Sequence, residues 1–176
     1  SSSDLGDLLD GDFSVWNLVG NLTQPLLQGG RLRAGVDLAR SNVRKLGLRN
    51  VEFHLTEMEP SPIPDGSADV IISNCVINLA PDKDAVFKEA YRILRAGGRI
   101  FVSDMLLTEE LPAEAKFDNA NWVACLSGAE LKETYLERMR DAGFKGVATI
   151  SETPFEGAAG WRSRVISMDI RAVKPL

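Results

Sequence analysis

The segment that most constrains the fold is an apolar run that leads directly into three polar residues. Residues 70–72 (Val-Ile-Ile) follow the turn cluster 65–67 (Asp-Gly-Ser) and continue as residues 73–75 (Ser-Asn-Cys). A β-branched run bounded by a turn is typical of a strand that is covered on both faces. Because open α/β sheets bind ligands beyond the carboxyl ends of their strands, a ligand site is expected to begin at Cys75.

Strand and helix signals alternate on both sides of this run. Strands are predicted at residues 13–21, 31–37, 50–55 and 99–104, and helices at residues 38–47, 82–94 and 129–142, with Asp82 as a helix N-cap. Residues 147–150 and 165–173 are expected to pair as an antiparallel closing hairpin. The alternation predicts one α/β domain spanning residues 1–176, with a mostly parallel sheet and helices on both faces.

Composition limits the possible partners. The 176 residues are 44% apolar and 26% charged, with a net charge of −5 and no cluster of Lys and Arg, which argues against nucleic acid as a partner. No apolar run approaches the roughly 20 residues of a membrane span, and the first residues lack the pattern of a signal peptide, so a cytoplasmic location is expected. Two cysteines and one histidine are too few for a structural zinc site, and a cytosolic setting disfavours a structural disulfide, so the cysteines are expected to act as thiols.

Several motifs together resemble the class I methyltransferases that use S-adenosylmethionine, and more narrowly the arsenite methyltransferases. The most specific part is residues 73–79 (Ser-Asn-Cys-Val-Ile-Asn-Leu), followed by residues 81–83 (Pro-Asp-Lys). Residues 122–129 (Trp-Val-Ala-Cys-Leu-Ser-Gly-Ala) resemble the second cysteine segment of that family. The match covers roughly residues 35–144. The resemblance implies a Rossmann-like fold, with residues 1–104 as the cofactor-binding half and residues 105–176 as helical cover and closing strands.

The resemblance also implies a chemistry. Cys75 and Cys125 would hold trivalent arsenic, a soft centre that thiolates bind well, with its lone pair free to attack the methyl group of S-adenosylmethionine. Asp37 would bind the ribose of this cofactor, and Met58 and Glu59 would lie at its adenine. The remaining cofactor contacts would come from Asn74 and Gly20. A thiol reductant is a possible partner, and the oligomeric state is left open.

Each assignment has a structural alternative. Cys75 and Cys125 could be small core residues, since cysteine is often buried, and Asp37 could be a helix N-cap. Met58 and Glu59 could belong to a solvated loop, and Asn74 could cap the turn that follows it. Two other functions therefore stay open: a methyltransferase with another small-molecule acceptor, and a non-catalytic binding protein of the same fold.

The sequence departs from the family pattern mainly in the cofactor half. The expected glycine-rich loop is represented only by residues 17–21, which contain the single glycine Gly20. Two further cysteines of the family are absent near the N-terminus, and no polar lead-in separates Asp37 from Leu38. Either the segment that carries the loop is missing from the printed chain or it has degenerated.

Overall fold

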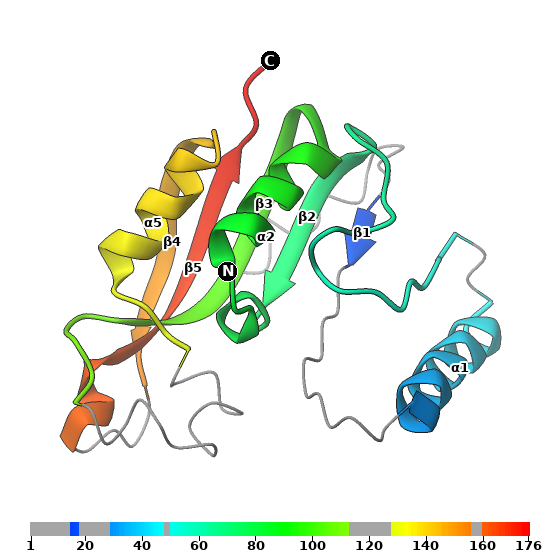
Figure 1. Ribbon diagram of the computed structural model, residues 1–176, viewed down its shortest axis with the longest axis horizontal. Helices are drawn as coiled ribbons and strands as arrows, with labels where there is room; N and C mark the ends of the chain where they lie inside the picture. Colours follow the sequence, from blue (N-terminus) through cyan, green and yellow to red (C-terminus); the bar gives the residue numbers. More distant parts are fainter. Residues whose placement is uncertain (1–14, 18–28, 48–49, 113–127, 156–159) are drawn as a thin grey trace.

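A five-stranded mixed sheet forms the centre of the structure, a computed structural model that describes residues 15–17, 29–47, 50–112, 128–155 and 160–176 (Figure 1). In chain order the elements are β1 (Val15–Asn17), α1 (Gly29–Lys45), β2 (Ala68–Asn74), η2 (Ile77–Leu79), α2 (Lys83–Ile93), β3 (Leu94–Leu107), α5 (Lys132–Asp141), β4 (Lys145–Pro154), η3 (Gly160–Arg164) and β5 (Val165–Val173). None of the described helices is long and apolar enough to cross a membrane.

The sheet has a parallel half and an antiparallel half, in the order β1-β2-β3-β5-β4. β1, β2 and β3 run parallel, with Ile71 opposite Ile100 and Asn74 opposite Ser103. β5 pairs antiparallel with both β3 and β4, which confirms the predicted antiparallel pairing of the two C-terminal strands. The parallel register brings the carboxyl ends of β2 and β3 to the same edge, where Cys75 follows β2.

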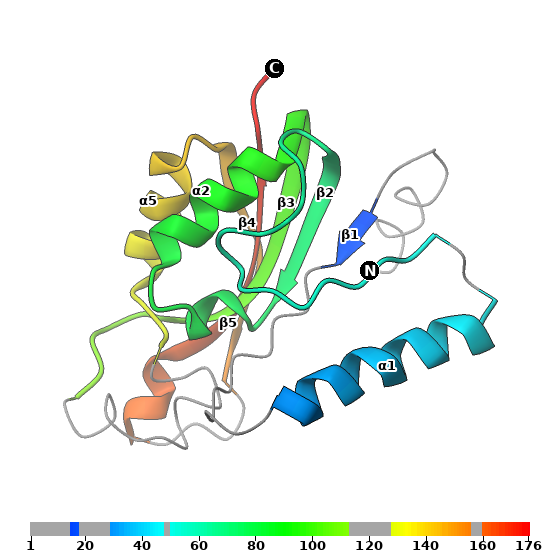
Figure 2. The same ribbon diagram turned by 45° about the vertical axis from the view of Figure 1, so that its right-hand side comes forward.

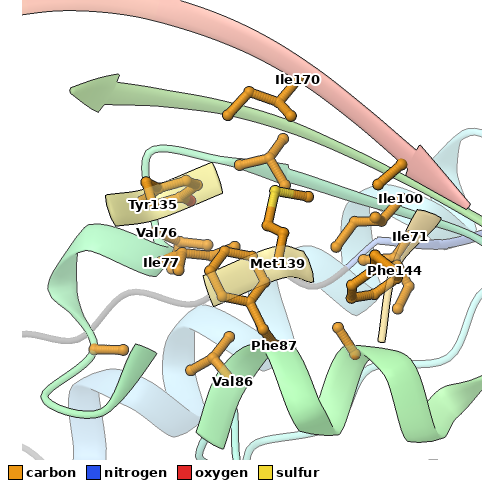
Figure 3. Packing of buried hydrophobic residues seen from close by; sticks show 14 of the residues in the cluster. Ile71, Val76, Ile77, Val86, Phe87, Ile100, Tyr135, Met139, Phe144 and Ile170 are labelled. Atoms are coloured by element: carbon orange, nitrogen blue, oxygen red, sulfur yellow. The ribbon is translucent and has the colours of Figure 1, made fainter. Parts of the chain in front are cut away.

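Two helices cover one face of the sheet. α2 and α5 lie side by side over it, and the main apolar core fills the space between them and the strands (Figures 1 and 3). Phe87 of α2 meets Tyr135 of α5 edge to face, with ring centroids 5.2 Å apart, and both side chains are fully buried. This packing fixes α5, and with it the Tyr135 hydroxyl, against β3.

The predicted helix after residue 81 and its cap are confirmed. The Asp82 carboxylate accepts a hydrogen bond from the Ala85 N–H at 2.9 Å, which satisfies one of the unpaired donors of the first turn of α2. The apolar residues of α2 recur at helical spacing and are buried on the side that faces the sheet. They are Val86, Phe87, Ala90 and Ile93.

Two of the predicted strands are wrong. Residues 31–37 belong to α1, which runs without interruption through Asp37 and Leu38. No breaker separates these two residues, and Leu32, Val36 and Val43 recur at helical spacing, so the helix predicted from Leu38 extends backwards. α1 stands clear of the sheet on the side of β1, and Leu38 is 63% exposed (Figure 2).

The other wrong strand is residues 50–55. This segment has no strand or helix, and Val51 and Leu55 are exposed. Residues 31–37, the predicted strand nearest to this segment in the sequence, belong to α1 and cannot pair with it. A strand without a partner is not stable in water. The remaining predicted strands are confirmed with changed limits: β1 is shorter than residues 13–21, and β3 is longer than residues 99–104.

Arg92 fastens the loop before β2 to helix α2. Its guanidinium donates to both oxygens of Glu89 at 2.7 and 2.8 Å and to the Ile63 carbonyl at 2.8 Å, and it also pairs with Asp65. Glu89 in turn accepts the Ser61 N–H at 2.7 Å. These bonds hold the loop that carries Met58 and Glu59 against the body of the fold.

The Glu89 carboxylate should make the stability depend on pH. Its hydrogen bonds with Arg92 lower the pKa of Glu89 from 4.5 to about 2. The hydrogen bonds of the ionised Glu89 therefore contribute fully to the free energy of unfolding above pH 4.5, and this contribution is lost as the pH falls towards 2. Glu89→Gln should lower the free energy of unfolding at pH 7 by about 1–3 kcal/mol and should flatten its decline between pH 5 and pH 3. Denaturant titrations across this pH range measure both effects.

The matched control is Glu137→Gln, which changes an exposed glutamate of α5. It should leave the free energy of unfolding within about 0.5 kcal/mol of the unsubstituted protein at each pH. Equal acid dependence in Glu89→Gln and the unsubstituted chain would contradict the role given to Glu89.

Candidate functional site

Cys75 lies at the carboxyl end of β2 in a strained backbone conformation. Its φ of 53° is in the left-handed region, and it is the one such residue other than glycine in the described ranges. Its N–H donates to the Ser103 carbonyl at 2.8 Å, so the turn is fixed to β3. A β-carbon disfavours this conformation, and strain of this kind is found most often at functional sites. The partly buried thiol is thus presented at the edge where the sequence predicts a ligand.

A buried polar pair lies beside this turn. The Tyr135 hydroxyl donates to Asp104 Oδ2 at 2.6 Å, and both residues are at most 1% exposed. Burial raises the pKa of Asp104 to about 7, although the hydrogen bond from Tyr135 and the nearby Lys83 ammonium both lower it. Burial, Asp104, Glu130 and Cys75 all raise the pKa of Tyr135, so this hydroxyl stays protonated within electrostatic reach of the Cys75 sulfur.

Sequence reasoning assigned no role to Asp104 or Tyr135. A signal for Asp104 was present, because it ends the predicted strand 99–104 as Ser73 and Asn74 end the strand before it. Tyr135 falls within the predicted helix 129–142, and the signal there is its hydroxyl, which must find a partner when buried. Their pairing depends on the packing of α5 on β3, which neither local pattern contains.

Asn78 ties the turn after β2 to the segment that precedes α5. It is fully buried, and its Nδ2 donates to the Met105 carbonyl at 2.5 Å. Gly128 packs against its backbone so closely that a β-carbon added at Gly128 would lie 2.1 Å from the Asn78 carbonyl oxygen. The glycine is therefore required by contact rather than by its dihedral angles.

This contact has a consequence for the two cysteines. Cys125 lies outside the described residues, but it precedes Gly128 by three residues, just as Cys75 precedes Asn78 by three. Three residues span at most about 11 Å, at ~3.8 Å between successive Cα atoms. The Cα atom of each cysteine is therefore no farther than this from the Cα atom of the contact residue on its own segment. The pairing of both cysteines at one site stays a prediction, and the Asn78–Gly128 contact is compatible with it.

A cleft of about 420 Å³ opens between the start of α2, the end of β3 and the start of α5. Lys83, Glu130 and Arg138 line it, among others. Glu130 pairs with both cations: Lys83 at 3.7 Å and Arg138 at 2.8 Å. Burial lowers the pKa of Lys83, while Glu130 opposes this effect. Since Glu130 already neutralises much of this positive charge, the cleft is not a strong site for an anion.

The residues predicted to bind a cofactor are not brought together by the described structure. Asp37 is exposed on α1, so the strand end on which its ribose role was based does not exist. Asn74 is exposed at the carboxyl edge of β2, where a ligand could reach it. Gly20 lies outside the described residues. The cofactor roles of all three stay predictions; of the two that the structure describes, Asn74 lies at the expected edge and Asp37 does not.

Met58 and Glu59 lie in the loop that Arg92 and Glu89 fasten. Met58 is 6% exposed and belongs to the main core, which agrees with a packing role. Glu59 is partly exposed, and burial together with the nearby carboxylates of Asp82, Glu57 and Glu89 raises its pKa. Their predicted contact with the adenine is not tested by these observations. Among the described residues, no group of three or more Cys, His, Asp or Glu side chains could hold a metal ion.

Comparison with known proteins adds independent information about the family. A family model described as a methyltransferase domain matches residues 32–143. The arsenite methyltransferase of Halobacterium salinarum is 41% identical over 112 residues, covering 64% of this chain and 29% of its own length. The arsenite methyltransferase of Rattus norvegicus is 44% identical over 124 residues, covering 61% of this chain and 33% of its own. The chain thus spans about a third of the length of these relatives.

A solved structure supports the same fold. The arsenic(III) S-adenosylmethionine methyltransferase of Chlamydomonas reinhardtii aligns with a TM-score of 0.68 at 26% identity, covering 92% of this chain and 54% of that one. The expected Rossmann-like architecture is confirmed by this similarity and by the parallel β1-β2-β3 half of the sheet.

The contact between Gly128 and Asn78 can be tested by substitution. Gly128→Ala should lower the free energy of unfolding by about 2 kcal/mol or more, because the new methyl group overlaps a backbone oxygen that cannot move freely. The control is Gly35→Ala in α1, where an added β-carbon meets no atom within 4 Å, and helix propensity should stabilise the chain by up to about 1 kcal/mol. Thermal and denaturant unfolding measure both changes, and an unaffected Gly128→Ala protein would contradict the contact.

Proposed function

The chain belongs to the methyltransferase-domain family, and on this premise we propose that it transfers a methyl group from S-adenosylmethionine to trivalent arsenic bound by Cys75 and Cys125. The acceptor is suggested by the curated relatives, which are arsenite methyltransferases. Because the chain covers about a third of their length, the activity of the whole protein is part of the proposal.

The observation that carries this proposal is the position of Cys75. It presents a thiol at the carboxyl edge of the parallel strands, on a strained turn that is fixed to β3. A cysteine that served only as a small core residue would need neither partial exposure nor a left-handed backbone. The Asn78–Gly128 contact supports the second ligand, because it joins the two segments that carry the cysteines.

Trivalent arsenic suits such a site. It is a soft centre that forms strong bonds to thiolates and retains a lone pair, so it can act as a nucleophile without a general base. S-adenosylmethionine supplies an electrophilic methyl group on a sulfonium. The role of the protein is then to hold the arsenic in one position and to exclude water from it. On the donor side, Asn74 lies at the appropriate edge, whereas Asp37 does not.

The proposal predicts that methyl transfer depends on both thiols. Cys75→Ser and Cys125→Ser should each reduce transfer of labelled methyl groups to arsenite by at least about 100-fold, because a hydroxyl is a poor ligand for a soft centre. Thermal unfolding of the same samples shows whether each variant is folded. Unchanged arsenite turnover in both variants would exclude the thiol-ligand mechanism, and cofactor binding without arsenite binding would favour a different small-molecule acceptor.

A second candidate, an arsenic-binding protein that does not transfer methyl groups, is favoured by the placement of Asp37. Its carboxylate lies on an exposed helix rather than at a strand end, so the one acid predicted to bind the ribose is not at the position on which that prediction was based. This candidate predicts that calorimetry with S-adenosylmethionine gives no heat of binding, while arsenite still binds. Stoichiometric binding of S-adenosylmethionine would rule it out.

A further inference from the structure

The cleft between the start of α2, the end of β3 and the start of α5 is a cavity that the proposed function does not use. Its volume of about 420 Å³ lies in the range of clefts that hold small molecules. Leu107, Leu111 and Ala129 line it and belong to the smaller apolar core cluster, against which Leu131 also packs. An apolar wall with a few convergent polar groups is the usual form of a small-molecule site.

Lys83 is a polar group of this cleft that lacks hydrogen bonds. Its side chain is 8% exposed, and its ammonium pairs with Glu130 Oε1 at 3.7 Å, a distance longer than a normal hydrogen bond. Both oxygens of Glu130 accept shorter hydrogen bonds from Arg138, at 2.8 and 3.2 Å. Within the described part of the chain, the N–H donors of the buried Lys83 therefore have no acceptor at hydrogen-bond distance, which is unfavourable.

The start of α5 adds further donors to the same cleft. Leu131 is the N-cap of this helix, and no side chain accepts a hydrogen bond there, whereas Asp82 caps α2. The first-turn N–H groups and the positive end of the helix dipole favour an electron-rich oxygen. Leu131 and Thr134 of this helix start line the cleft. The buried Lys83 and the uncapped α5 thus independently favour an acceptor oxygen in the cleft.

The charges that line the cleft determine what kind of oxygen fits. Lys83 and Arg138 are balanced by Glu110 and Glu130, and Arg138 also pairs with Asp84 at 2.7 Å. An anion would be attracted by the cations and repelled by the glutamates, and a cation would meet the reverse. An uncharged carbonyl oxygen accepts the available hydrogen bonds without adding a net charge to the cleft.

We propose that the cleft binds an uncharged small molecule in which an amide carbonyl is joined to a branched apolar group. The carbonyl oxygen accepts a hydrogen bond from Lys83, and the apolar group packs against Leu107, Leu111 and Leu131. The Thr134 hydroxyl is available to the amide N–H. This site is independent of the proposed function, because none of its lining residues is assigned to arsenic or to S-adenosylmethionine.

The test uses N-acetylleucinamide, which contains both parts of the proposed ligand. In nuclear magnetic resonance titrations of the full chain, the backbone amide signals of Lys83 and Thr134 should shift along one saturable curve. N-acetylleucine has the same apolar group but carries a carboxylate at neutral pH, and it should bind no more tightly than the amide because Glu110 and Glu130 oppose its charge.

Two substitutions and a control test the named contacts. Lys83→Met removes the donors but keeps an unbranched side chain, and it should weaken binding of N-acetylleucinamide about tenfold. Thr134→Phe fills the cleft while Lys83 is retained, and it should abolish binding. Lys88→Met is the matched control, since Lys88 is an exposed lysine of the same helix α2, and it should leave the dissociation constant unchanged.

Each outcome decides for or against the site. Saturable shifts that weaken in Lys83→Met and not in Lys88→Met support it. The absence of shifts at Lys83 and Thr134, or an unchanged affinity in Lys83→Met, overturns it, and tighter binding of N-acetylleucine would make the cleft an anion site instead. Thermal unfolding shows that each variant is folded, and Lys83→Met should unfold at a temperature at least as high as the unsubstituted chain, because an apolar side chain replaces a buried charge.

Discussion

The parallel pairing of β2 with β3 is the constraint on which the rest of the site depends. It brings the ends of both strands to one edge, so that Cys75 and Asp104, which are far apart in the sequence, become neighbours. The hydrogen bond from Cys75 to Ser103 extends this pairing by one residue beyond β2. The left-handed turn that follows directs the chain into η2 and Asn78 rather than onward along the strand.

The core behind this edge supplies the second requirement, which is rigidity. Phe87, Tyr135 and Met139 pack between α2, α5 and the sheet, with no appreciable exposure of any of the three (Figure 3). Because α5 cannot shift without opening this core, the Tyr135 hydroxyl stays on Asp104. An apolar packing arrangement thus determines the position of a polar group. The Asp104–Tyr135 pair beside Cys75, where the methyl acceptor is proposed to bind, depends on this packing.

The two halves of the chain differ in how completely they reproduce the family architecture. The described elements from β2 to β5 share one main apolar core, and β5 pairs with β3 along its whole length. At the N-terminal end, α1 stands clear of the sheet and residues 50–55 form no strand. The position of Cys75, where the methyl acceptor is proposed to bind, can therefore be argued from contacts. The binding of the methyl donor rests on similarity to relatives.

The sequence by itself determined the elements whose signals are local. These are the β-branched run of β2, the Asp82 cap, the helices α2 and α5, and the final two strands. It also indicated Cys75, because residue order alone places it after a buried strand. It misassigned residues 31–37 and 50–55, since a strand exists only if another strand accepts its hydrogen bonds. Only the tertiary structure paired Asp104 with Tyr135, placed Gly128 on Asn78 and buried Lys83 beside Glu130, because these facts depend on contacts between distant segments.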